Sequence, residues 1–150
     1  MDNYRAPVPD TVPGAEVLHI PAMQQHVARH DAVLIDVLPA PRRPVNMRSE
    51  MPWLPGRHAS IPGSFWWPEI GRGGITASMA DRLRKRLEEV TRGDPARMVV
   101  FFCLADCWMS WNAARRAAEM GFHAAWFPEG VDGWQAAGLQ TQDTLAEEFE

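Results

Sequence analysis

The sequence contains little cysteine and no excess of positive charge. Its 150 residues include two cysteines, and its 15 Lys and Arg are outnumbered by 19 Asp and Glu, which gives a net charge of −4. Nucleic acids and anionic membranes bind clustered, uncompensated cations, so we expect neither partner. Two cysteines are also too few for a disulfide framework that replaces a hydrophobic core.

Long apolar runs are absent too. No segment approaches the length of a transmembrane helix, so we expect no membrane insertion, and no charged-then-apolar leader opens the chain. A chain of this length can bury the core of one domain. We predict a flexible, proline-rich arm over residues 1–14, one domain over 15–142 and an acidic, partly disordered tail over 143–150. The arm would equally suit the start of an exported protein whose leader has been removed.

Two common sets of catalytic residues are missing. The five histidines lie in ordinary contexts, and no Gly-x-Ser-x-Gly precedes a predicted helix, so a hydrolase triad is not indicated. Cysteine-based phosphatase chemistry requires an arginine six residues after the nucleophile. Counting from Cys103, that position is Met109.

Apolar runs alternate with segments of helical periodicity. Continuous runs predict buried strands at residues 32–37, 98–102 and 124–127, with shorter strands at 16–20 and 61–67. Helical spacing, Pro and Gly predict helices at residues 21–29, 75–92, 110–120 and 131–137. Strands that alternate with helices indicate an α/β fold, in which a parallel sheet carries helices on both faces.

Both cysteines lie where the strand at 98–102 meets the helix at 110–120. Free backbone N–H groups and the helix dipole at such a junction favour a thiolate or a bound anion. We expect Cys103, which leaves the strand directly, to be alkylated faster than Cys107, although the negative charge of Asp106 opposes thiolate formation. Buried core thiols or a structural disulfide remain an alternative.

The residues around the cysteines are the candidate substrate contacts. They are Leu104, Ala105, Asp106, Trp108 and Met109 in and beside the loop, and Arg42 and Arg43 in the long connection after the strand at 32–37. The two arginines would supply the positive charge that the loop lacks, because ligands bind at the carboxyl ends of parallel strands. An equally good interpretation is that the two arginines are solvated loop residues with no role in ligand binding.

Three blocks of the sequence resemble the rhodanese-like domain. They are Val33-Leu-Ile-Asp36-Val37, then Gly56-Arg-His58-Ala-Ser-Ile61-Pro-Gly-Ser64, and the cysteine segment followed by Phe127-Pro-Glu-Gly130-Val-Asp-Gly-Trp134. More narrowly, Cys103-x-x-x-Cys107-Trp108 resembles a bacterial subfamily associated with pyrroloquinoline-quinone-dependent alcohol catabolism. Members of that subfamily look like periplasmic proteins, which implies a periplasmic location here.

The resemblance implies a site and its partners. Cys103 would be the position that carries a persulfide, and Asp36 would organise nearby loops. The implied partners are a small sulfur donor or a thiol acceptor and a periplasmic redox protein. No cofactor is implied as a requirement, and pyrroloquinoline quinone would be linked only indirectly. The loop departs from thiosulfate-type rhodaneses because it has no cationic side chain and contains a second cysteine.

Three functions remain open at this stage. Cys103 can transfer sulfur, with Cys107 as acceptor or resolving thiol, or the two cysteines can form a reversible disulfide that exchanges with a partner. The alternative is a binding module without catalysis, which uses flat indole faces for a redox cofactor or a partner protein. Its candidate residues are Trp53, Trp66, Trp67, Trp108 and Trp111. His58 is a conceivable third metal ligand, but no four-ligand set is evident, so we expect no metal.

Overall fold

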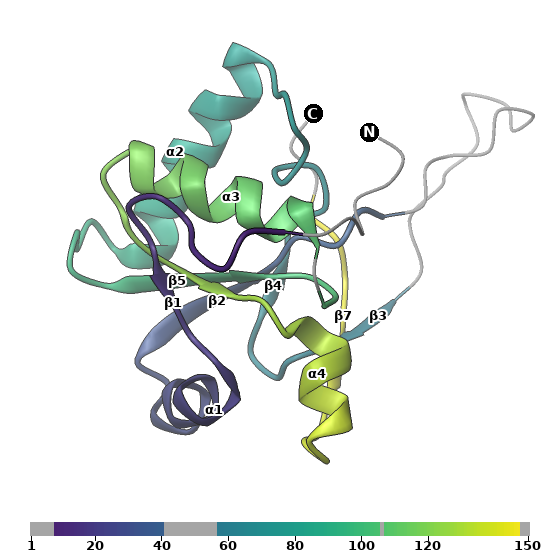
Figure 1. Cartoon of the computed structure of the whole chain (residues 1–150). Helices are drawn as coiled ribbons and strands as arrows, with labels where there is room; N and C mark the ends of the chain where they lie inside the picture. Colours follow the sequence, from purple (N-terminus) through teal and green to yellow (C-terminus); the bar gives the residue numbers. More distant parts are fainter. Residues whose placement is uncertain (1–7, 41–56, 106, 148–150) are drawn as a thin grey trace, which may run out of the picture.

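The computed structural model describes residues 8–40, 57–105 and 107–147. A five-stranded parallel sheet with the order β1-β6-β5-β2-β4 forms its centre (Figure 1). The strands are β1 (Glu16–Val17), β2 (Ala32–Asp36), β4 (Phe65–Trp66), β5 (Met98–Phe102) and β6 (His123–Phe127). The prediction of an α/β fold in which residues 33–37, 98–102 and 124–127 share one parallel sheet is therefore confirmed.

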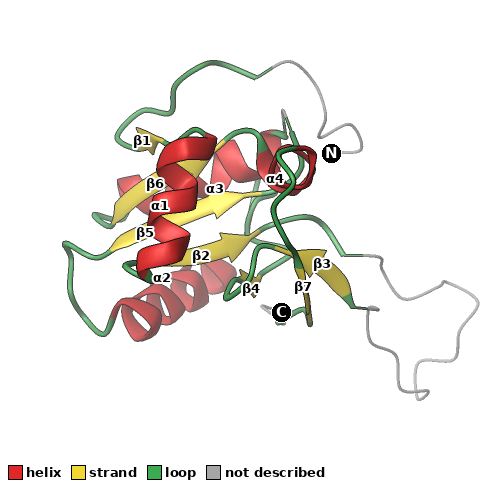
Figure 2. Cartoon of the chain, turned by 90° about the horizontal axis from the view of Figure 1, so that it is seen from below, coloured by secondary structure: helices red, strands yellow, loops and turns green. Residues whose placement is uncertain are grey.

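Helices cover both faces of this sheet. On one face lie α1 (Ile20–Arg29) and α4 (Gly130–Ala136), and on the other lie α2 (Ala77–Thr91) and α3 (Trp108–Glu119) (Figures 1 and 2). Side chains alternate across a strand, so successive residues of one strand enter different cores. Phe101 and Cys103 enter the core beneath α2 and α3, whereas Phe102 enters the core beneath α1 and α4. Both cysteines belong to the α2 and α3 side.

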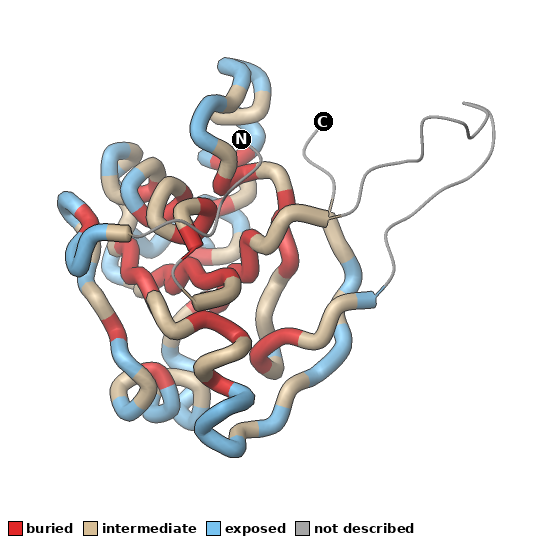
Figure 3. Tube along the Cα trace, turned by 45° about the vertical axis from the view of Figure 1, so that its right-hand side comes forward, coloured by how far each residue is buried: buried red, intermediate tan, exposed pale blue. Residues whose placement is uncertain are grey.

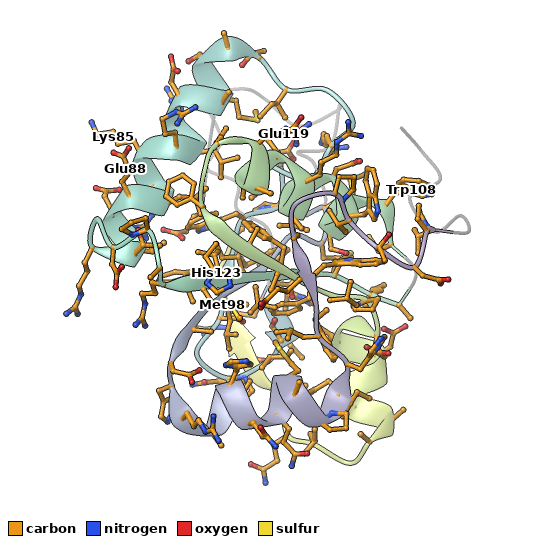
Figure 4. The ribbon with its side chains drawn as sticks, turned by 60° about the vertical axis from the view of Figure 1, so that its left-hand side comes forward. Lys85, Glu88, Met98, Trp108, Glu119 and His123 are labelled. Carbon is orange, nitrogen blue, oxygen red and sulfur yellow. The ribbon has the colours of Figure 1, made fainter. Side chains whose placement is uncertain are left out.

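Local chemistry sets the ends of α2, the longest helix. The Thr76 side chain accepts the backbone N–H of Met79 at 3.1 Å, and Arg92 ends the helix in the left-handed conformation. Lys85 and Glu88 project outward from it, away from the sheet (Figure 4). Within the described residues, no helix has the length and apolar character needed to cross a membrane.

The strand predicted at residues 61–67 is wrong as a single strand. A turn divides the segment, with the Ser64 N–H donating to the Ile61 carbonyl and Gly63 in the left-handed region. Before the turn, β3 (His58–Ser60) pairs antiparallel with β7 (Gln142–Thr144), and after it β4 pairs with β2. The Pro62-Gly63 pair favours a turn over a continuous strand.

Packing extends beyond the predicted domain limits of 15 and 142. In the arm, Val12 is buried and the Thr11 carbonyl accepts the indole N–H of Trp111 at 3.0 Å. In the acidic tail, residues 142–144 form β7, and Glu147 accepts hydrogen bonds from the Trp67 indole and from Arg86. Figure 3 shows the buried stretches gathered around the central sheet. The sequence missed these contacts because polar, acidic segments carry no apolar periodicity.

Candidate active site

The two cysteine sulfurs are in direct contact at the carboxyl edge of the sheet. Cys103 follows the last residue of β5, and Cys107 is the residue that caps the amino end of α3. Their Sγ atoms are 2.6 Å apart, and both cysteines are free thiols. The strand-to-helix junction therefore brings together the pair that the sequence singled out.

Both thiols are fully covered by protein, with an exposed fraction of 0%. Burial, followed by the hydrogen bond with Cys107, raises the pKa of Cys103. The same hydrogen bond, followed by the backbone N–H groups at the start of α3, lowers the pKa of Cys107 despite its burial. Cys107 is therefore the more acidic thiol of the pair. This order is the reverse of the one expected from the sequence, because Cys107 lies closer to the free N–H groups of α3.

The start of α4 binds the cysteine loop, of which the structure describes residues 103–105 and 107, from one side. The Cys103 carbonyl accepts the Val131 N–H at 2.8 Å, and the Asp132 carboxylate accepts the Ala105 N–H at 2.6 Å. Gly130 allows this approach, because a Cβ atom there would lie 2.4 Å from the Cys103 carbonyl oxygen. The loop is therefore hydrogen-bonded to α4 through the Cys103 carbonyl and through the Ala105 N–H.

The segment before α2 holds the first turns of α3 from the other side. A Cβ at Gly71 would lie 2.5 Å from the Met109 carbonyl oxygen, so only glycine fits against this turn. Asn112 donates to the Gly71 carbonyl at 3.0 Å, and Arg116 donates to the Ile70 carbonyl at 2.6 Å. The contact at Met109 and the Asn112 bond hold the amino-terminal half of α3, near the sulfurs, and the Arg116 bond holds its last turn.

Asp36 organises the connections at the end of β2. Its carboxylate is buried and accepts the Leu38 N–H at 2.9 Å, the Ser60 hydroxyl at 2.7 Å and the His58 imidazole at 2.6 Å. The structural role that the resemblance implied for Asp36 agrees with these contacts. His58 is engaged by this carboxylate, and the described residues contain no group of three or more His, Cys, Asp or Glu placed to hold a metal ion.

The other residues predicted to contact a substrate differ in their surroundings. Leu104 packs against both cores, and Met109, a residue of α3, is buried in the core that contains the cysteines. Trp108 is half-buried and packs edge-on against Trp111, with ring centroids 5.0 Å apart (Figure 4). Four predicted residues lie outside the described residues, namely Arg42, Arg43, Trp53 and Asp106.

The positions of Trp66 and Trp67 do not fit a surface that binds a planar ligand through exposed indole faces. Trp66 and Trp67 are buried, with exposed fractions of 2% and 0%, and the Trp66 indole N–H donates to the Leu38 carbonyl. Buried rings have no free face for a planar ligand, so the surface loses two of its candidate members. Trp66 belongs to strand β4, within the segment predicted as a strand, and this position in the sheet buries its ring.

Sequence reasoning missed Asp132 as a site residue. It follows β6, which neighbours β5 in the sheet, so the carboxyl ends of both strands share an edge. That rule, applied to the polar residues after residues 124–127, would have selected Glu129 and Asp132. Glu129 faces His19, with its Oε2 atom 2.7 Å from the imidazole, whereas Asp132 reaches the cysteine loop.

Comparison with solved structures identifies the fold. A thiosulfate sulfurtransferase from Pseudomonas aeruginosa matches over 88% of this chain and 21% of its own, with 22% identity and a TM-score of 0.55. A human single-domain sulfurtransferase matches over 82% and 97%, with 18% identity and a TM-score of 0.51. A full-length protein from Lactobacillus plantarum matches over 84% and 86%, with 18% identity and a TM-score of 0.56. The fold is therefore rhodanese-like.

No protein-family model and no curated protein matches the sequence. The chain spans about a fifth of the Pseudomonas enzyme's length. At these levels of identity, the similarity establishes the arrangement of strands and helices. The reaction has to be inferred from the residues of the site.

Proposed function

We propose that this protein is a rhodanese-fold thiol protein whose Cys103–Cys107 pair cycles between dithiol and disulfide in exchange with a partner. The observation that carries the proposal is the 2.6 Å contact between two free thiols at the carboxyl edge of the sheet. A disulfide requires the two sulfurs to meet, and this loop already brings them into contact.

The chemistry follows from the charge distribution in the pair. The Cys107 thiolate attacks one sulfur of a partner disulfide, forms a mixed disulfide and releases the partner's other sulfur as a thiolate. Cys103 then loses its proton and attacks the Cys107 sulfur, which releases the second partner thiolate. The partner gains two electrons, and the pair loses two as the new disulfide forms. Because both sulfurs are covered, the loop must open before the first attack.

A second candidate is sulfur transfer through a single cysteine. It is supported by the position of Cys103 directly after β5 in a rhodanese-like fold. A thiolate attacks the outer sulfur of a donor such as thiosulfate, the S–S bond of the donor breaks, sulfite leaves, and the cysteine becomes a persulfide. An acceptor thiolate then attacks the outer sulfur of the persulfide and releases the cysteine thiolate. The absence of any cationic side chain from the described loop residues disfavours a dianionic donor.

Intact mass spectrometry with matched variants separates the two candidates. The reduced protein is exposed either to hydroxyethyl disulfide, which is uncharged, or to thiosulfate, and Cys103→Ser and Cys107→Ser are treated in parallel. Disulfide exchange predicts a loss of two hydrogens in the wild type and a lasting mercaptoethanol adduct in Cys103→Ser. Fast thiosulfate turnover that persists in Cys107→Ser would instead establish single-cysteine sulfur transfer.

The proposed setting is the periplasm, beside a quinoprotein of alcohol catabolism. Support comes from the Cys103-x-x-x-Cys107-Trp108 resemblance and from the oxidising conditions that a lasting disulfide needs. The chain itself would hold no pyrroloquinoline quinone, and its partner would be a periplasmic redox protein. Fractionation of the source cells followed by thiol trapping tests this setting. A chain found in the cytoplasm with both thiols reduced would contradict it.

A further inference from the structure

The backbone N–H of Ala105, in the cysteine loop, donates to a carboxylate of the same chain. Successive backbone N–H groups on a tight loop before a helix can make a concave site that binds anions. In this protein the Ala105 N–H is directed instead at the Asp132 carboxylate, 2.6 Å away. A carboxylate of the chain thus occupies a donor that an oxyanion would need.

The position of Asp132 is enforced by its helix. Gly130 contacts the Cys103 and Leu104 backbone so closely that an added Cβ would lie within 2.4 to 2.8 Å of three atoms. The Val131 N–H binds the Cys103 carbonyl one residue further along. The backbone of Asp132 is therefore held beside the loop, where its carboxylate accepts the Ala105 N–H.

We infer that Asp132 is a specificity-determining residue that closes the cysteine loop to oxyanions and leaves it open to neutral or cationic thiols and disulfides. The inference rests on the proposed function, because it describes which partners reach the same sulfurs. The carboxylate acts in two ways: it occupies the Ala105 donor, and its negative charge repels a dianion such as thiosulfate.

Paired alkylating reagents measure this charge selection directly. Iodoacetamide is neutral and iodoacetate is anionic, while both have similar size and react with the same thiolate. Opening of the buried site slows both reagents equally, so the ratio of their rates reports the local charge alone. We expect Asp132→Asn to raise the iodoacetate-to-iodoacetamide ratio by about three- to tenfold. The asparagine oxygen can still accept from Ala105, so the loop contact is preserved.

The matched control is Glu119→Gln, which removes one negative charge at the far end of α3. Twelve residues of helix separate it from Cys107, or about 18 Å at the usual rise. We expect this control to leave the ratio within about twofold of the wild type, because exposed charges at that separation are largely screened. Equal ratios in Asp132→Asn and Glu119→Gln would overturn the inference.

A second readout tests oxyanion access. Attack of a cysteine thiolate on thiosulfate breaks the S–S bond, forms a cysteine persulfide and releases sulfite. Sulfite release is the measurement, because the neighbouring thiol can convert the persulfide to the Cys103–Cys107 disulfide with loss of hydrosulfide. We expect Asp132→Ala, which frees the Ala105 N–H, to release sulfite at least tenfold faster than wild type, and Asp132→Glu to stay slow. Sulfite release that is as slow in Asp132→Ala as in wild type would contradict the inference.

The two hypotheses fail in different ways. If the wild type forms no disulfide with uncharged hydroxyethyl disulfide but Asp132→Asn raises the reagent ratio, the redox proposal fails and the role of Asp132 stands. If the disulfide forms and the ratio does not change, the role of Asp132 fails alone.

Discussion

His58 and Asp36 are joined by a 2.6 Å contact between the imidazole Nε2 and the buried carboxylate. They are 22 positions apart in the sequence and belong to different sheets, since Asp36 ends β2 and His58 begins β3. The contact therefore fastens the small antiparallel sheet to the central one, close to the edge where the cysteines lie.

Removal of the Asp36 carboxylate should destabilise the fold. We expect Asp36→Ala to lower the free energy of unfolding by about 3 kcal/mol, because His58, Ser60 and the Leu38 N–H lose a buried acceptor together. Urea unfolding followed by tryptophan fluorescence measures the change. The exposed Asp143 is the control, and Asp143→Ala should change the unfolding free energy by less than about 0.5 kcal/mol. Similar losses in both variants would refute the organising role of Asp36.

The pKa of Cys107 should depend on its neighbour. Because the hydrogen bond with Cys103 is the largest cause of the lowered pKa, Cys103→Ala should raise the pKa of Cys107. A higher pKa leaves less thiolate at neutral pH, so the iodoacetamide rate should fall and its pH midpoint should move upward. Cys103→Ser keeps a hydroxyl donor, and its midpoint should stay closer to that of the wild type. Loss of all alkylation in both variants would place the reactive thiolate on Cys103 instead.

Two glycines in left-handed conformations should respond differently to alanine. Gly130 has φ of 66° and no room for a Cβ, whereas Gly138 has φ of 82° with nothing within 4 Å. We expect Gly138→Ala to cost about 1 kcal/mol, the cost of the backbone conformation alone. Gly130→Ala should cost about 3 kcal/mol or more, because it also displaces the cysteine loop.

Displacement of that loop should expose the sulfurs. Gly130→Ala, studied below its unfolding midpoint, is expected to be alkylated by iodoacetamide several-fold faster than Gly138→Ala. Equal stability losses and equal rates would show that α4 does not hold the loop. The measurement pairs thermal unfolding with a timed thiol assay on the same samples.

The end of the chain should contribute to stability. Glu147 accepts from the Trp67 indole and from Arg86, whose guanidinium also lies over the Trp67 ring. We expect Glu147→Ala to lower the free energy of unfolding by about 1 to 2 kcal/mol and to shift Trp67 fluorescence. Glu119→Ala, whose exposed partner Arg115 is 4.0 Å away, should cost less than about 0.5 kcal/mol. No difference between the two variants would mean that this contact does not stabilise the fold.

The sequence by itself determined the parallel sheet and the place of the cysteines. Continuous apolar runs at residues 32–37, 98–102 and 124–127 have one stable arrangement, because helical segments between them enforce parallel crossovers. The carboxyl end of residues 98–102 then had to deliver Cys103 beneath a helix start. These inferences depend on periodicity and chain order, which the sequence carries in full.

Only the tertiary structure determined which groups contact one another in the site. The contact between the sulfurs, the lowered pKa of Cys107 and the bond from Ala105 to Asp132 depend on the curl of the loop and on the close approach that Gly130 permits. Pairing of β7 with β3 and the Glu147 contacts likewise join residues that no local pattern relates. Such contacts are set by the three-dimensional path of the chain, because short polar segments gain their stability only from the partners they meet in the fold.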